Sequence, residues 1–219
     1  MTVRRYELVV FDWDGTLMDS AGAIARSILA ACRDLGLAEP AEERARHVIG
    51  LGLSEALAHA VPELAPSEYP RLVERYRHHY LSADHELMLF PGIAELIRRL
   101  SGDGHLLAVA TGKSRVGLRR ALEHTGLGPY FHGTRSADEC HSKPHPAMLM
   151  ELMQELGVAP QETLMVGDTT HDLQMARNAG VAALGVSFGA HPRAALESEP
   201  AIGIVDTPQA LAAWFESRR

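Results

Sequence analysis

The sequence is poor in cysteine and lacks long apolar runs, and these absences exclude several classes of protein. Its two cysteines, Cys32 and Cys140, lie far apart and form no Cys-x-x-Cys pair. This disfavours a zinc site or a disulfide framework and fits a reducing compartment. No apolar run approaches the length of a membrane span, and the chain enters its first predicted strand without the features of a secretory leader. We therefore expect a cytoplasmic protein with no membrane partner.

The sequence also lacks a basic tract, and its charge balance is acidic. It carries 21 Lys and Arg against 28 Asp and Glu, a net charge of −7 with a pI near 5.9. Nucleic acid is therefore not an expected partner. An anionic substrate would need local positive charge or a metal, because the overall field repels it. The 219 residues suggest one or two domains, and the sequence does not predict an oligomeric state.

The first predicted strand, Leu8–Phe11, is an unbroken apolar run typical of a strand buried on both faces. Asp12 follows it directly and Asp14 comes two residues later, before Gly15. Alternate side chains of an extended chain share a side, so both carboxylates would point beyond the strand's carboxyl end, where open parallel sheets bind ligands. Two close carboxylates repel one another unless a proton or a cation lies between them. An isolated Asp-x-Asp-Gly is more often a solvated turn, so its interpretation depends on the rest of the chain.

The rest of the sequence divides into a helical block and an alternating pattern of strands and helices. Between residues 21 and 83 the apolar spacing is typical of helices and no strand is predicted, and a further helix spans 93–100. Strands are then predicted at 106–110, 130–131, 163–166, 181–186 and 202–205, with helices at 116–124, 146–156, 171–179 and from 207.

Repeated strand–helix units of this length predict an α/β fold, a Rossmann-like parallel sheet with helices on both faces. The helical block interrupts this fold after its first strand. We expect residues 1–16 and 88–219 to form the α/β core and residues 17–87 a small all-helical domain.

Polar groups recur at three later points of this pattern. Thr111 ends a predicted strand, and Gly112 leads into a helix start whose free N–H groups suit a phosphate oxygen, although a threonine N-cap is as common. Lys143 lies in a loop held by two prolines, where it would be a fixed counter-charge, although a lone lysine is usually solvated. Asp168 ends another buried strand, and Asp172 falls in the first turn of the next helix. Asp172 either belongs to the site with Asp168 or only stabilises the helix dipole.

Together these motifs resemble those of the haloacid dehalogenase-like hydrolase superfamily. Its four motifs appear in order over essentially the whole chain: Asp12-Trp-Asp14-Gly-Thr, a strand ending in Thr111, Lys143 with Pro144, and Gly167-Asp168 with Asp172. The helical block directly after the first motif resembles the family's C1 cap. The stretches 11–20 and 47–52 are most similar to the phosphoglycolate phosphatase-like branch.

The resemblance implies a phosphatase that hydrolyses a small phosphomonoester, phosphoglycolate-like or a sugar phosphate. Asp12 would be the nucleophile that forms an aspartyl-phosphate. Asp14 would protonate the leaving alkoxide and then take a proton from water. Thr111, the Gly112 N–H and Lys143 would hold the phosphoryl oxygens as charge redistributes.

The same resemblance implies a Mg²⁺ cofactor, a cation that prefers six oxygen ligands. Its protein ligands would be the Asp12 carboxylate, the Asp14 backbone carbonyl and Asp168, with Asp172 acting through water or a neighbouring ligand.

The cap would exclude solvent and contact the leaving group. We expect its hinges at 15–17 and 87–91. Arg46, His47 and the loop 50–54 are the candidates for facing the substrate, although His47 also fits a helix surface.

Three other functions share part of this pattern. A phosphotransferase or phosphomutase of the β-phosphoglucomutase type would use the same aspartyl-phosphate and return the phosphoryl group to a sugar. A non-enzymatic phospho-acceptor module, as in response-regulator receivers, would not require a helical domain of this size. Dehalogenation needs no Mg²⁺, and the presence of Asp14 with Asp168 argues against it.

Overall fold

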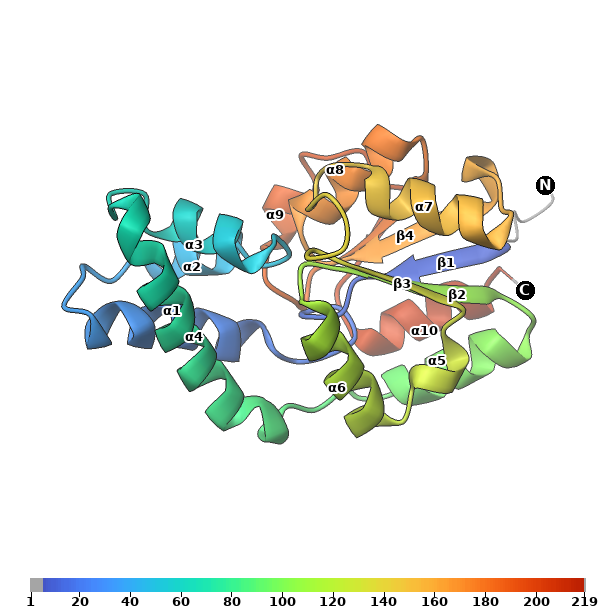
Figure 1. The fold of residues 1–219 in the computed structure, drawn as a ribbon. Coiled ribbons are helices and arrows are strands. Elements are labelled where there is room, and N and C mark those ends of the chain that lie inside the picture. The colour runs from blue at the N-terminus through green and yellow to red at the C-terminus, as the bar shows by residue number, and fades with distance from the viewer. Residues whose placement is uncertain (1–5, 219) are drawn as a thin grey trace.

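The computed structural model describes residues 6–218, which form a parallel sheet covered by helices and a helical block beyond the carboxyl ends of the strands (Figure 1). All strand pairings are parallel, in the order β3-β2-β1-β4-β5-β6. The strands are β1 (Leu8–Phe11), β2 (Leu106–Thr111), β3 (Gly133–Ser136), β4 (Thr163–Gly167), β5 (Ala182–Val186) and β6 (Gly203–Val205). The predicted Rossmann-like α/β fold is confirmed.

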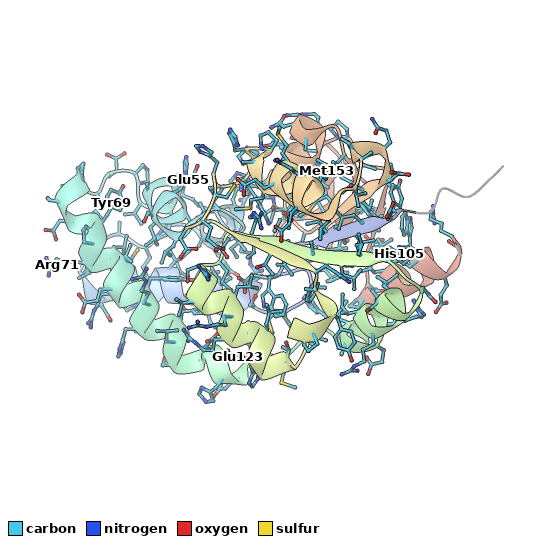
Figure 2. All side chains as sticks on the ribbon, turned by 45° about the vertical axis from the view of Figure 1, so that its right-hand side comes forward. Glu55, Tyr69, Arg71, His105, Glu123 and Met153 are labelled. Carbon is cyan, nitrogen blue, oxygen red and sulfur yellow. The ribbon has the colours of Figure 1, made fainter. Side chains whose placement is uncertain are left out.

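Helices cover both faces of the sheet because its strands are apolar on both sides. In β1, Val9 and Phe11 pack into one cluster with helices α5, α6 and α10, whereas Leu8 and Val10 pack on the other side with α7, α8 and α9. Met153 of α7 belongs to this second cluster (Figure 2). These helices are α5 (Ile93–Gly102), α6 (Arg115–Thr125), α7 (Ala147–Leu156), α8 (Thr170–Ala179), α9 (Arg193–Leu196) and α10 (Pro208–Glu216).

Four helices between β1 and α5 form a separate block, the helical insertion (residues 21–83). They are α1 (Ala21–Asp34), α2 (Glu42–His47), α3 (Leu53–Ala60) and α4 (Tyr69–Ala83). They have an apolar cluster of their own, to which Ile28, Leu57 and Leu72 contribute fully buried side chains. Figure 1 shows the insertion beyond the ends to which the strand arrows point.

The two connections between the insertion and the sheet run side by side. Phe90 N–H donates to the Leu17 carbonyl at 3.0 Å, and Asp19 N–H donates to the Met88 carbonyl at 2.9 Å. Met18 forms an antiparallel bridge with Leu89. The two chain connections between the insertion and the core therefore lie next to each other.

The strand that pairs with β2 at the sheet edge, β3, does not lie where the sequence predicted it. Residues 130–131 were expected to form it, but Tyr130 ends a 3₁₀ turn (Gly128–Tyr130) and β3 begins at Gly133. The aromatic side chains of Tyr130 and Phe131 pack against the core cluster on the α5 face instead of forming a strand. The short helix α9 was also not expected. Within residues 6–218, no helix is long and apolar enough to cross a membrane.

Candidate active site

The site is built at the carboxyl end of β1, next to β4, where the strand order changes direction. Asp12 directly follows β1 and is 1% exposed. Its N–H donates to the Val166 carbonyl of β4 at 2.9 Å, which continues the sheet pairing by one residue. The chain then turns at Gly15, which has a φ of +89°. A side chain at Gly15 would overlap the Asp168 carboxylate, so glycine lets the turn approach the end of β4 closely.

Three buried carboxylates and one buried ammonium meet at this point. Lys143 Nζ lies 2.7 Å from Asp12 Oδ1 and 2.6 Å from Asp172 Oδ1, and the lysine is fully buried. Asp12, Asp168 and Asp172 each offer an oxygen, and these oxygens lie within 4.8 Å of one another. Asp12 Oδ2 is buried without a hydrogen-bond partner among the described residues. One ammonium does not balance three carboxylates, so a bound cation fits this cluster.

The pKa values of these groups reflect the same imbalance. Burial raises the pKa of Asp12, Asp172 and Asp168 raise it further, and Lys143 opposes them. Burial and the charge of Asp172 raise the pKa of Asp168 to about 7. Burial disfavours the ammonium of Lys143, but Asp12 and Asp172 outweigh this and raise its pKa. A cation bound by the carboxylates would favour their ionised forms.

Hydrogen bonds from several segments fix the orientation of two of these carboxylates. Thr16 Oγ1 donates to Asp168 Oδ1, and Ala190 N–H donates to Asp168 Oδ2, both at 2.7 Å. Asp172 Oδ2 accepts from the Thr169 hydroxyl at 2.7 Å and from the Thr169 N–H at 3.0 Å. The bond from Thr169 N–H and the reciprocal bond from Asp172 N–H to Thr169 Oγ1 at 3.3 Å form a capping box at the start of α8, so Asp172 both caps the helix and contacts Lys143.

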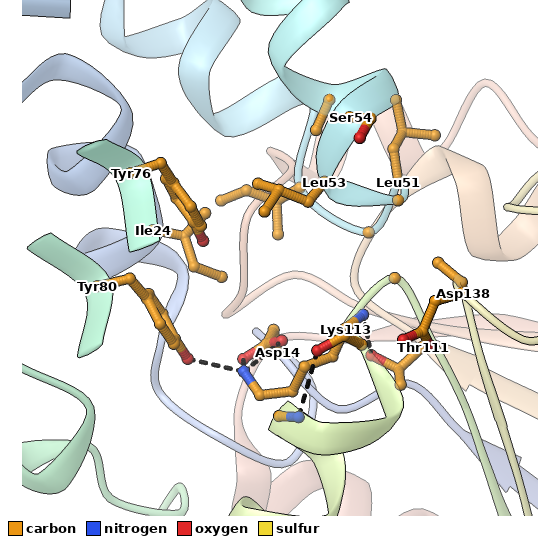
Figure 3. A pocket seen from close by; sticks show the side chains of 18 of the residues that line it. Asp14, Ile24, Leu51, Leu53, Ser54, Tyr76, Tyr80, Thr111, Lys113 and Asp138 are labelled. Atoms are coloured by element: carbon orange, nitrogen blue, oxygen red, sulfur yellow. Dashed lines mark hydrogen bonds and ion pairs between the residues drawn. The ribbon is translucent and has the colours of Figure 1, made fainter. Parts of the chain in front are cut away.

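Asp14 has different neighbours from Asp12. Ser20 Oγ donates to Asp14 Oδ1 at 2.7 Å, and Lys113 Nζ lies 3.1 Å from each carboxylate oxygen. Lys113 Nζ also donates to the Tyr80 hydroxyl of α4 at 2.7 Å (Figure 3). The second carboxylate of the first motif is thus linked through Lys113 to the helical insertion. Local sequence does not point to Lys113, Ser20 or Tyr80 as site residues, because the contacts that link them to Asp14 form only in the folded chain.

A cavity of about 740 Å³ lies between the sheet edge and the insertion. Asp12, Asp14 and Thr111 line its core side together with Gly112. Thr111 ends β2 and is 1% exposed. A methyl group at Gly112 would overlap the carbonyl oxygens of residues 50–51, so the insertion loop lies directly against the phosphate-site candidate Gly112.

Of the expected insertion residues, the loop 50–54 lines the cavity, but Arg46 and His47 do not belong to its lining. Arg46 is directed to Glu42 instead, with Nε 3.0 Å from the carboxylate in an exposed i,i+4 pair. Arg46 and His47 therefore lie outside the lining of this cavity, and their contact with the substrate stays a prediction. At the end of α2, the neighbours of both residues are set by local pairing and by packing on the core.

His47 instead lies against two histidines of the core. Its ring stacks on His191 with 4.8 Å between centroids, and its carbonyl accepts from His171 Nε2 at 2.8 Å and His191 Nε2 at 3.0 Å. Burial lowers the pKa of His171. Burial, with a contribution from His171, lowers the pKa of His191 to about 4. His191 also accepts the Thr170 N–H at Nδ1, so the neutral ring joins the two parts of the chain.

The sheet and this site define a class of parallel α/β proteins with a carboxylate-rich centre at the ends of the central strands. The model of the haloacid dehalogenase-like hydrolase family matches residues 9–186, and the chain belongs to this family.

Similar proteins of known name extend over nearly the whole chain. A probable phosphatase, IndB, of Dickeya dadantii is 39% identical over 91% of this chain and 89% of its own length. A phosphoglycolate phosphatase of Agrobacterium fabrum is 33% identical over 95% of this chain and 92% of its own. The crystal structure of a predicted phosphoglycolate phosphatase from Haemophilus somnus 129pt superposes with a TM-score of 0.84 at 26% identity, covering 98% of both chains.

Proposed function

We propose that this protein is a Mg²⁺-dependent phosphatase that hydrolyses a small phosphomonoester through an aspartyl-phosphate at Asp12. Membership of the hydrolase family and the phosphatase names of its relatives support this reaction. The observation that carries it is the unpartnered Oδ2 of Asp12, buried beside an ammonium and two further carboxylates. Phosphoglycolate and sugar phosphates are the substrate classes that the family resemblance suggests.

In the proposed first step, Asp12 attacks phosphorus in line with the leaving group. A bond forms between Asp12 oxygen and phosphorus, the bond from phosphorus to the ester oxygen breaks, and the leaving alkoxide takes a proton from Asp14. In the second step, Asp14 takes a proton from water as that water attacks the aspartyl-phosphate and releases inorganic phosphate. Asp14 suits this role because it lines the cavity and is oriented by Ser20 and Lys113.

Binding of the phosphoryl group is assigned to three groups near Asp12. Thr111 offers a hydroxyl, Gly112 a backbone N–H and Lys143 a positive charge, all suited to oxygens that gain negative charge in the transition state. Lys143 also keeps Asp12 in place, since its ammonium contacts Asp12 Oδ1 at 2.7 Å.

The residues present fit Mg²⁺, because their donors are hard oxygens in negative excess. Asp12, Asp168 and the Asp14 backbone carbonyl would hold it, with Asp172 contributing directly or through water. When bound, Mg²⁺ would neutralise the carboxylates and the phosphate charge.

We assign residues 17–87, which include the helical insertion, to a cap domain on a core of residues 1–16 and 88–219. The paired connections at 17–19 and 88–90 would let it move as a unit. Closure over the cavity would exclude water during the first step.

The test is phosphate release from p-nitrophenyl phosphate, with Mg²⁺ and with EDTA, by the wild type and by Asp12→Asn. We expect turnover with Mg²⁺, loss of turnover in EDTA, and less than about a thousandth of wild-type turnover in the variant. Met150→Ala is a suitable control, since Met150 is 55% exposed on α7. Residual Asp12→Asn turnover above that level, with the fold intact by circular dichroism, would remove Asp12 from its role.

A further inference from the structure

The part of the cavity above Asp14 has an apolar wall supplied by the insertion. Ile24 comes from α1, Leu53 from α3 and Tyr76 from α4, and Figure 3 shows their side chains extending into the same space opposite Asp14. Ile24, Leu53 and Tyr76 are half-buried, so each keeps apolar surface in contact with solvent. Tyr76 is held by stacking on Tyr80, with 5.8 Å between centroids and 14° between planes. A rigid apolar wall of this kind gains most from an apolar ligand that displaces water from it.

The basic side chains of the same cavity are largely committed to other carboxylates. Lys113 is paired with Asp14. Arg120 lies 2.9 Å from Asp84. The third base, Arg77, is exposed to solvent.

The acidic groups on these walls outnumber the bases. Four carboxylates line this part of the cavity, those of Asp14, Glu55, Asp84 and Asp138. The bases that line it are Arg77, Lys113 and Arg120. A leaving group with a carboxylate of its own would therefore meet a wall of net negative charge.

The size of the cavity also favours a leaving group that is larger than two carbons and apolar. Its volume of about 740 Å³ lies within the range of roughly 300–1,000 Å³ typical of pockets that enclose drug-sized ligands. A leaving group of two carbons would touch Asp14 but leave the apolar wall in contact with water.

We propose, on the basis of the proposed function, that the preferred substrate is a phosphomonoester whose leaving group carries an uncharged apolar ring, which packs on Ile24, Leu53 and Tyr76. Phosphoglycolate, small and anionic at both ends, is a poorer substrate for this cavity. The insertion thus selects the alcohol, while the core contacts the phosphate.

Three esters with chemically similar primary alkoxide leaving groups test this preference in the presence of Mg²⁺: 2-phenylethyl phosphate, ethyl phosphate and phosphoglycolate. We expect kcat/KM for 2-phenylethyl phosphate to exceed that for ethyl phosphate by at least about tenfold, since single methylenes already give roughly 10- to 200-fold. Phosphoglycolate should not exceed ethyl phosphate. A higher kcat/KM for phosphoglycolate than for 2-phenylethyl phosphate would overturn this inference but leave the phosphatase activity standing. Failure to hydrolyse any of the three, with p-nitrophenyl phosphate still hydrolysed, would overturn this inference alone. Failure to hydrolyse p-nitrophenyl phosphate as well would overturn the proposed function itself.

Variants of the apolar wall test whether its residues cause this substrate preference. In Leu53→Asn, and in the milder Leu53→Ala, the ratio of kcat/KM for 2-phenylethyl phosphate to that for ethyl phosphate should fall by about tenfold. Met150→Asn on α7 should leave the ratio unchanged. An unchanged ratio in folded Leu53→Ala and in folded Ile24→Ala would overturn the assignment. If Arg77→Gln lowered kcat/KM tenfold for phosphoglycolate alone, Arg77 would bind the carboxylate of that substrate. This result would also contradict the proposed preference.

Discussion

Replacing Lys143 with methionine tests the charge balance of the buried cluster. Lys143 Nζ contacts Asp12 at 2.7 Å and Asp172 at 2.6 Å, and no part of the lysine is exposed. Methionine keeps similar length but leaves the three carboxylates without the ammonium. Breaking a buried ion pair by removing one partner costs about 3–5 kcal/mol. For a chain of 219 residues, at about 2–4 °C per kcal/mol, the melting temperature should fall by roughly 6–20 °C.

The assay is thermal unfolding at pH 7.5, in EDTA and in Mg²⁺. Burial with two carboxylates raises the folded-state pKa of Lys143, so its stabilisation is fully present below the pKa of an unfolded lysine, about 10.4, and is lost as the pH rises through the folded value. At pH 7.5 the full effect is measured. Mg²⁺ at 100 times its dissociation constant adds about 2.7 kcal/mol to the stability of the protein that binds it. Removing the ammonium leaves the carboxylates more negative, so Lys143→Met should bind Mg²⁺ more tightly than the wild type, and at one Mg²⁺ concentration the difference between their melting temperatures should narrow.

Arg193→Met is the matched control for removal of a cation. Arg193 lies 2.8 Å from Glu197 and 2.6 Å from Asp206 on the surface, and these side chains are 46%, 54% and 60% exposed. Exposed pairs contribute about 0–1 kcal/mol each. The control should therefore melt within a few degrees of the wild type. A Lys143→Met melting temperature within 2 °C of the wild type in EDTA, where ~6 °C is the least expected, would refute the account of the cluster.

Three further predictions follow from single contacts. Asp14→Asn should slow both formation and hydrolysis of the phospho-enzyme by about 10²–10⁴-fold, measured by quenched flow; a variant that accumulates phospho-enzyme yet releases phosphate at the wild-type rate would contradict the dual role. Gly112→Ala should lower kcat/KM at least about tenfold with the fold retained, because its methyl group would displace the loop 50–51; unchanged kinetics would place that loop away from the site in solution. Burial and its hydrogen bond to Glu151 raise the pKa of Cys140 to about 11, so roughly 0.1% is thiolate at pH 8 and iodoacetamide alkylation should increase about tenfold per pH unit up to pH 10; Glu151→Gln should react faster at pH 8, and a rate independent of pH would disprove the shift.

Much of the fold was predictable because its central strands are short apolar runs that end in polar residues. β1, β2 and β4 were recognised in this way, and their carboxyl ends do meet, as the positions of Asp12 and Asp168 show. The edge strand β3 was misplaced because its sequence, Gly-Thr-Arg-Ser, has no apolar run. Its position depends on pairing with β2, which local sequence does not reveal.

The site was predictable where motifs supply their own chemistry and unpredictable where contacts join distant segments. Lys113 is separated from Tyr80 by 33 residues and from Asp14 by 99, so periodicity carries no sign of either contact. Arg46 was predicted to face the substrate, and in the structure it pairs with a glutamate one turn earlier in the same helix. Ion pairing within a helix competes with a substrate contact, so residue type alone does not predict which partner an arginine takes.

Lys113 and Lys143 are the only lysines in the sequence, and every other fixed cationic side chain is an arginine. One contacts the carboxylate of Asp14 and the other that of Asp12, where a compact ammonium fits and a planar guanidinium would demand more room. Amine-directed labels consequently have few other targets on this molecule. The extent of acylation would report how often these two positions open to solvent, with no background from surface lysines.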